Sequence, residues 1–61
     1  MPIINISHTQ TMEPSAKNEL VKKVTDAYVA ATGANPANVW VAISEIKKDD
    51  FGIAGVTLSH R

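Results

Sequence analysis

The feature that most constrains the fold is one long amphipathic segment between two short runs rich in valine and isoleucine. In residues 14–32 apolar side chains recur at spacings of three and four residues, with charged side chains between them, which predicts a helix with one buried face. Pro14 suits the first turn of this helix, and Gly33 suits the position just after its end. The runs 2–8 and 39–46 predict strands. A strand, a helix and a strand form a βαβ unit with parallel, adjacent strands and a right-handed crossover.

The C-terminal part of the sequence predicts a second, smaller element. Residues 47–50 are all charged and predict an exposed turn. Residues 51–58 then carry Gly52 and Gly55 among apolar residues, which favours a short hairpin with tight backbone geometry. We therefore expect an α+β fold in one domain over residues 1–61, made of a βαβ protomer with parallel strands and a short C-terminal β-hairpin.

The size of the chain predicts that it does not work alone. A chain of 61 residues buries only about 60% of the surface that its unfolded form exposes. There is no cysteine for a disulfide and no Cys/His cluster for structural zinc, so the usual supports of a small fold are missing. A two-stranded sheet covered by one helix also leaves one face and both edges bare. We therefore expect an oligomer.

The overall composition excludes some classes of partner. Hydrophobic residues make up 44% of the chain and the formal net charge is zero, which favours a folded domain and argues against binding to nucleic acid through phosphate neutralisation. No apolar run is long enough to cross a membrane, and the N-terminus lacks the pattern of a signal peptide. We expect no membrane partner and a cytoplasmic location.

Pro2 is the residue with the most distinctive chemistry. If Met1 is removed, Pro2 becomes an N-terminal secondary amine at the head of the first strand. An amine of this kind is neutral and basic near physiological pH when its surroundings are apolar or cationic, so it can take up a proton or attack a carbonyl. The simpler alternative is that Pro2 only begins an edge strand, where its missing N–H does no harm.

Several stretches together resemble the 4-oxalocrotonate tautomerase family. They are the Met-Pro-Ile-Ile start, the helix, the strand rich in valine and isoleucine, and the run Phe51-Gly52-Ile53-Ala54-Gly55. The resemblance spans nearly the whole chain without gaps. It implies that the neutral nitrogen of Pro2 moves a proton next to a carbonyl, interconverting enol and keto forms without a metal or organic cofactor. It also implies that Phe51 keeps the pocket apolar, and that three dimers form a hexamer.

The sequence departs from that family at two positions. Members of the family carry arginines that grip a dicarboxylate substrate, and these positions are Met12 and Trp40 in this chain. Neither side chain can form a cationic carboxylate clamp. A pocket lined by Pro2, Met12, Trp40 and Phe51 is mostly apolar, so we expect an apolar or aromatic carbonyl substrate rather than a dicarboxylate.

Three polar residues are further candidates for the site. His8 and Thr9 follow the first strand, a place that the resemblance puts near the proline of a paired subunit, where His8 could act as an acid or hydrogen-bond donor. Asn38 is a second possible donor. The alternative for His8 is an ordinary surface histidine at a strand end. We therefore predict Pro2 as the catalytic residue and the following substrate-binding residues: His8, Thr9, Met12, Asn38, Trp40 and Phe51.

Two other functions remain open from the sequence. One is another proline-dependent activity of the same superfamily, such as hydration, dehalogenation or decarboxylation of a small acid. The other is a non-catalytic oligomeric scaffold that kept the fold, for which the missing arginines are the motivating feature.

Overall fold

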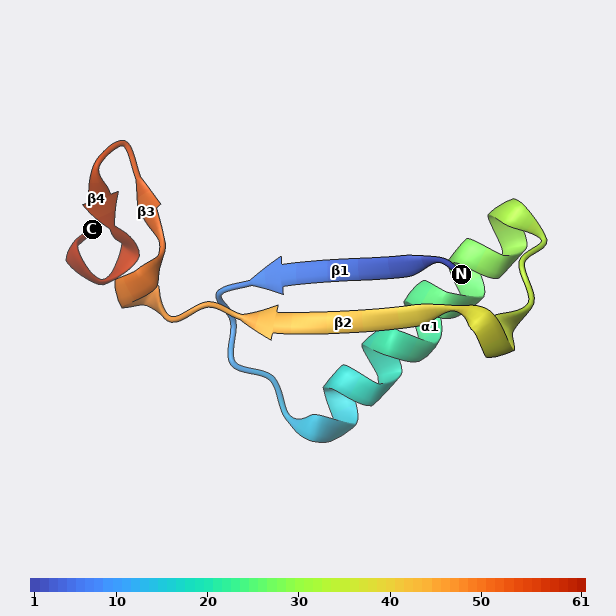
Figure 1. The fold of residues 1–61 in the computed structure, drawn as a ribbon. Coiled ribbons are helices and arrows are strands. Elements are labelled where there is room, and N and C mark those ends of the chain that lie inside the picture. Colours follow the sequence, from blue (N-terminus) through green and yellow to red (C-terminus); the bar gives the residue numbers. More distant parts are fainter.

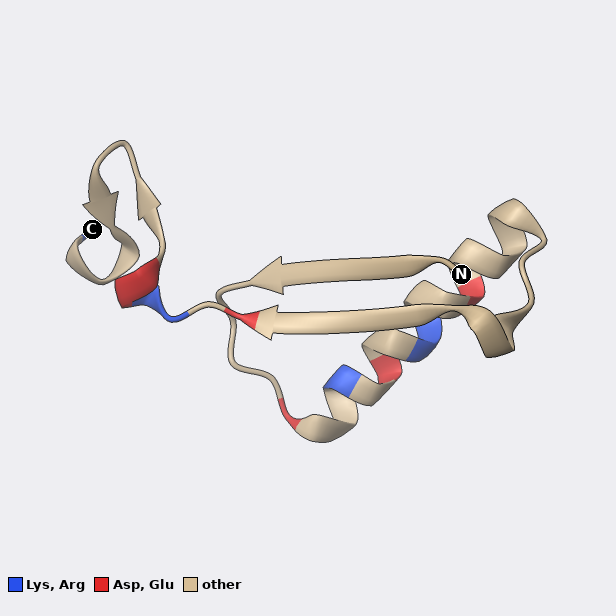
Figure 2. Cartoon of the chain, viewed as in Figure 1, with Lys and Arg blue, Asp and Glu red and all other residues tan.

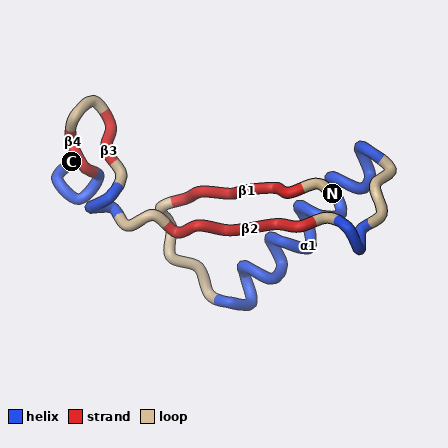
Figure 3. Tube along the Cα trace, in the orientation of Figure 1, coloured by secondary structure: helices blue, strands red, loops and turns tan.

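A computed structural model describes residues 1–61 and confirms the predicted order of elements (Figure 1). The α-helix and the strands have these bounds: β1 Ile3–His8, α1 Pro14–Thr32, β2 Trp40–Glu45, β3 Gly52–Ile53 and β4 Val56–Thr57. Single turns of 3-10 helix precede β2 (η1 Pro36–Asn38), precede β3 (η2 Lys48–Asp50) and follow β4 (η3 Leu58–His60). Figure 3 shows helix, strand and loop segments alternating along the chain. The α+β class, with a βαβ unit followed by a hairpin, is therefore confirmed.

The strands β1 and β2 form a parallel pair, as predicted. The register runs from Ile3 opposite Trp40 to His8 opposite Glu45. The ladder extends slightly past both strands, because the Trp40 N–H donates to the Pro2 carbonyl at 3.0 Å and the Ile46 N–H donates to the His8 carbonyl at 2.8 Å.

Both strands start one residue later than predicted. Pro2 has no N–H with which to join the ladder. The Val39 N–H donates instead to the carbonyl of Pro36, at 3.3 Å, and so belongs to the end of η1. The second strand also ends one residue earlier than predicted, at Glu45, although the Ile46 N–H still bonds to β1.

The helix α1 has the bounds that the sequence predicts. Pro14 occupies the first turn, where a missing N–H costs nothing. At the other end Gly33 adopts a left-handed conformation with φ of 75°, and its N–H donates to the Val29 carbonyl at 2.8 Å. This conformation is easy for glycine and closes the helix. Although α1 has 19 residues, it is not apolar enough to cross a membrane, and the chain has no other α-helix.

The helix covers one face of the sheet and leaves the other bare (Figure 1). Ile4 and Ile6 of β1 alternate with exposed neighbours, as do Val41 and Ile43 of β2, and these four side chains are half-buried against α1. No residue of the chain is fully buried. The isolated chain therefore has one thin apolar layer and no closed core, as its size predicts.

Residues 46–61 form a C-terminal arm that extends away from the sheet (Figure 1). In this arm β3 and β4 pair antiparallel, with Gly52 opposite Thr57. The turn between them uses Ala54 and Gly55 at φ of 53° and 85°. Two successive positive φ angles are typical of the tight turns that match the twist of a hairpin. The arm makes the molecule elongated, with extents of 43 × 24 × 15 Å.

Candidate functional site

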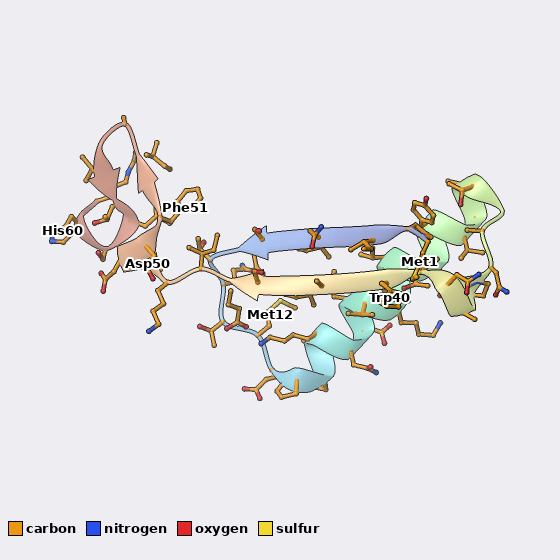
Figure 4. The ribbon with its side chains drawn as sticks, in the orientation of Figure 1. Met1, Met12, Trp40, Asp50, Phe51 and His60 are labelled. Atoms are coloured by element: carbon orange, nitrogen blue, oxygen red, sulfur yellow. The ribbon has the colours of Figure 1, made fainter.

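The structure divides the predicted site residues into three groups (Figure 4). Pro2, Asn38 and Trp40 lie at the end of the sheet where both strands begin. His8, Thr9 and Met12 lie at or beyond the end of β1. Phe51 lies on the C-terminal arm. The arrangement follows from the parallel pairing, because parallel strands place both heads at one end and both tails at the other.

The end of the sheet at which β1 and β2 begin is apolar and open. Pro2 is half-buried, and its carbonyl accepts the Trp40 N–H. Met1, Ile3 and Trp40 are 78%, 61% and 55% exposed. The alternation of the strands puts Ile3 and Trp40 on the bare face, whereas Pro2 follows the side of Ile4 that faces α1. Asn38 ends η1 close to these residues and is exposed. This end therefore offers a candidate base beside apolar surface, and none of residues 1–3 and 38–40 has a charged side chain.

The end at which the strands finish is polar and charged. Glu45 lies opposite His8 in the register, and the Nζ atom of Lys17 on α1 lies 2.6 Å from Oε1 of Glu45. The hydrogen bond from Lys17 lowers the pKa of Glu45 below its ordinary value; the charge of Lys17, the nearby backbone N–H of Met12 and the charge of His8 act in the same direction, and desolvation acts against them. The Nε2 atom of His8 is buried and has no hydrogen-bond partner. It is the one buried side-chain nitrogen or oxygen without a partner in this chain.

A hollow of about 360 Å³ opens at this same end, and we refer to it as the strand-end hollow. It is lined by two short segments that follow β1 and β2, namely Thr9, Gln10, Thr11, Glu45, Ile46, Lys47 and Lys48. Of the predicted site residues only Thr9 lines it. The structure therefore adds Glu45 and its neighbours to the candidates. The prediction of parallel strands could have indicated this location, because ligands of open sheets with parallel strands bind beyond the carboxyl ends of the strands.

One chain does not bring the predicted pocket together. The five residue steps from Ile3 to His8 separate the two ends of the sheet by roughly 17 Å. Phe51 lies further along the chain on the arm, and its side chain is 38% exposed. Pro2, Met12, Trp40 and Phe51 therefore cannot surround one small molecule within a single chain. No three His, Asp or Glu side chains lie close enough together to hold a metal ion.

Comparison with known proteins shows similarity to tautomerases over nearly the whole chain. Residues 2–61 match the family model of the tautomerase enzymes. The chain is 34% identical over 61 residues to a protein of Halalkalibacterium halodurans named a probable tautomerase, with all of both chains covered. It is 42% identical over 57 residues to the 2-hydroxymuconate tautomerase of Pseudomonas putida, covering 93% of this chain and 90% of that one.

Solved structures agree with the sequence matches. The crystal structure of YwhB, a homologue of 4-oxalocrotonate tautomerase, superposes with a TM-score of 0.92 at 33% identity and covers 98% of both chains. A heterohexameric 4-oxalocrotonate tautomerase from Chloroflexus aurantiacus shares the fold, with a TM-score of 0.87 at 22% identity and coverage of 97% of this chain and 95% of that one. The family model and the relatives cover essentially the whole chain, and the chain therefore belongs to the tautomerase family.

Proposed function

We propose that this protein is a cofactor-independent keto–enol tautomerase for a small apolar or aromatic carbonyl compound, with Pro2 as its general base after Met1 is removed. Membership of the tautomerase family supports the reaction class. The position of Pro2 supports its role, and this is the observation that carries the proposal. Pro2 is half-buried at the head of β1 beside exposed Ile3 and Trp40, so an apolar substrate that covers it removes water from the amine. Desolvation disfavours the protonated form, so the nitrogen is neutral and free to accept a proton.

The proton balance of this reaction needs only one base. The neutral nitrogen of Pro2 takes the proton of the enol O–H group. The electron pair of that O–H bond forms the new C=O bond, and the π electrons of the C=C bond move to the carbon atom next to the carbonyl. The protonated amine then returns the proton to that carbon, and Pro2 is neutral again. Because the same group accepts and delivers the proton, no oxidant or second substrate is required. His8 or Asn38 serves as the donor that stabilises the developing oxyanion.

We also propose that the complete site forms between chains. A two-fold pairing of one edge strand with its own copy is necessarily antiparallel, so the head of one β1 lies beside the end of the other. Pro2 of one chain then approaches His8, Thr9 and Met12 of a second copy. The edge of β1 is free for this pairing because the sheet contains only β1 and β2.

Further apolar surface supports a larger assembly. Ile3 and Trp40 remain exposed on the bare face, and Phe51, Ile53 and Val56 are exposed on the arm. A monomer rarely leaves so much apolar surface uncovered. We propose a hexamer built as a trimer of dimers, in which the arm carries Phe51 to the site of a neighbouring dimer. The heterohexamer from Chloroflexus aurantiacus shows that one protein with this fold assembles from six chains.

The experiment that tests the proposed function compares two forms of the protein. Mass spectrometry distinguishes processed protein, which begins at Pro2, from protein that retains Met1. Processed protein should ketonise the enol of phenylpyruvate, and protein that retains Met1 should not, because an amide nitrogen is not basic. The aromatic enol should also react faster than a dicarboxylate dienol, because Met12 and Trp40 cannot bind a second carboxylate.

Three outcomes would decide against this function. Equal turnover by both forms would mean that Pro2 is only the start of a strand. No turnover of any enol by processed protein would favour the non-catalytic scaffold, a possibility that the uncharged Met12 and Trp40 motivate. Release of another product from a small acid would instead indicate a different proline-dependent reaction, such as hydration or decarboxylation.

A further inference from the structure

The strand-end hollow has an excess of positive charge. Its only carboxylate, Glu45, is already paired with Lys17 at 2.6 Å. Lys47 and Lys48 also line the hollow, and neither makes an ion pair. Figure 2 shows this order of charges along the chain, with Glu45 at the end of β2 and the two lysines just after it. Two lysines that line the hollow are therefore without an ion-pair partner.

The acidic residues that follow these lysines lie outside the lining of the hollow and make no ion pair with them. Asp49 and Asp50 lie in η2 on the arm, and neither lines the hollow. Lys17 compensates Glu45 from the side of α1. The lining and this ion pair together carry a net charge of about two positive units near neutral pH.

The uncharged residues of the hollow also suit an anion. Thr9 and Thr11 each carry a hydroxyl donor and Gln10 carries an amide donor, whereas Ile46 is the only apolar residue of the lining. The volume of about 360 Å³ lies in the range of pockets that bind small molecules. A group that accepts several hydrogen bonds and carries one or two negative charges fits these residues best.

We propose that the strand-end hollow binds the carboxylate of a small organic acid, and that Lys47 and Lys48 provide its charge recognition. Met12 lies at this end of the sheet and is uncharged, so recognition of charge falls to the two lysines. The substrate of the reaction is then a monocarboxylic 2-oxo acid with an apolar remainder. The identity of the substrate rests on the proposed function and on the pairing that brings Pro2 of a second copy to this end. The binding of a carboxylate in the hollow depends on neither.

The kinetic test uses two double variants with the same change in net charge. Lys47→Gln/Lys48→Gln removes both positive charges from the hollow. The control, Lys22→Gln/Lys23→Gln, removes two adjacent lysines from the exposed side of α1, where they pair only with Asp26 and Glu19. The KM of each variant is measured for ketonisation of the enol of phenylpyruvate and of the enol of its methyl ester. The assays use low ionic strength because salt screens exposed charges. Circular dichroism checks that each variant is folded.

The two variants should differ in KM for the acid. Lys47→Gln/Lys48→Gln should raise that KM about tenfold, as expected for two lost charge contacts at a solvent-exposed site, with the KM for the ester unchanged. The control should change neither value. An equal rise in both variants would assign the effect to net charge alone, and no rise in either would overturn the proposal.

A binding measurement gives an answer that does not depend on turnover. Sodium benzoate is titrated into ¹⁵N-labelled wild-type protein and into both double variants. Amide signals of residues 9–11 and 45–48 should shift in the wild type and in the control, and should not shift in Lys47→Gln/Lys48→Gln. Absence of these shifts from the wild type would refute the hollow as an anion site, even if the protein is a tautomerase. Shifts without any turnover would keep the site and remove the proposed reaction.

Discussion

The two ends of the β1–β2 sheet have opposite chemical character. Where the strands begin, Pro2 lies next to exposed apolar residues, of which Ile3 and Trp40 are 61% and 55% exposed. Where they finish, the Lys17–Glu45 ion pair borders a hollow with polar walls. The first end has the proposed base, and its residues 1–3 and 38–40 are uncharged; the second end has the proposed carboxylate site and no such base. In the proposed antiparallel pair of chains, each end supplies what the other lacks.

The largest effect should come from breaking the pairing of the two ends. The carbonyls of Pro2 and His8 both accept hydrogen bonds from β2. In a parallel ladder every second residue of a strand bonds to the partner strand, so the residues between them, including Asn5, direct their N–H groups to the free edge of β1. Asn5→Pro removes that N–H without touching the β1–β2 ladder. We expect the pair of chains to dissociate and the activity to fall by about 100-fold or more, which is the size of the rate enhancement that general-base catalysis provides.

The control for this variant is Asn5→Ala, which keeps the N–H. It should remain assembled and active in analytical ultracentrifugation and steady-state assays. Full activity of a monomeric Asn5→Pro protein would show that a single chain contains the whole site.

A smaller effect is expected from changing the base itself. Pro2→Ala leaves a primary amine in nearly the same place, so activity should fall about tenfold, a part of what general-base catalysis contributes. The rate with processed wild type should rise with pH as the secondary amine loses its proton. Circular dichroism should show the same fold for both proteins. Unchanged rates across the pH range would mean that the base lies elsewhere.

Mixing variants tests directly whether one site uses both ends. One partner is Pro2→Ala and the other is Lys47→Gln/Lys48→Gln, each assayed below the KM for phenylpyruvate. After dissociation and joint reassembly, random pairing gives mixed pairs in about half of the cases, and each mixed pair has one intact site. Activity should rise to about a quarter of the wild-type value plus the residual activities. A mixture that stays at the mean of the two variants would place each site within one chain.

The smallest effect concerns the stability of the charged end. The folded state lowers the pKa of Glu45 below 4.5, so the ion pair with Lys17 stabilises the fold above that pH and is lost as pH falls through the folded pKa. Glu45→Gln should lower the urea midpoint slightly at pH 7 and by less at pH 3. Asp26→Asn, which breaks the exposed pair with Lys22, is the matched control. A larger loss at pH 3 than at pH 7 would contradict this role of Glu45.

The backbone of this chain is readable from its sequence because its signals are local. Pro14 and Gly33 mark the bounds of α1, and Ile4 and Ile6 alternate with the polar Asn5 and Ser7, a pattern that indicates which face of β1 meets the helix. The exact starts of the strands are less readable. Val39 has a strong strand preference, yet its N–H bonds to η1, because the turn that Pro36 begins has to finish first.

The candidate site is readable only in part, because it depends on contacts between distant residues. Pro2 stands out as an unusual chemical group from its position alone. The Lys17–Glu45 pair joins a helix and a strand that are far apart in the sequence, and neither residue is unusual in its own segment. Lys47 and Lys48 belong to a run that predicts an ordinary solvated turn. Only the fold shows that they share a hollow with Thr9.

The C-terminal arm has a consequence for how fast chains can associate. Its turn at Ala54 and Gly55 is already formed, the Leu58 N–H donates to the Phe51 carbonyl at 2.9 Å, and Thr57 Oγ1 lies 2.7 Å from Nδ1 of His60. A segment that is ordered before docking has lost its conformational entropy in advance, so that loss does not weaken binding. Phe51 then enters an encounter on a hairpin that is already formed rather than on an extended tail. Assembly of such chains should be limited by collision and orientation rather than by folding of the arm.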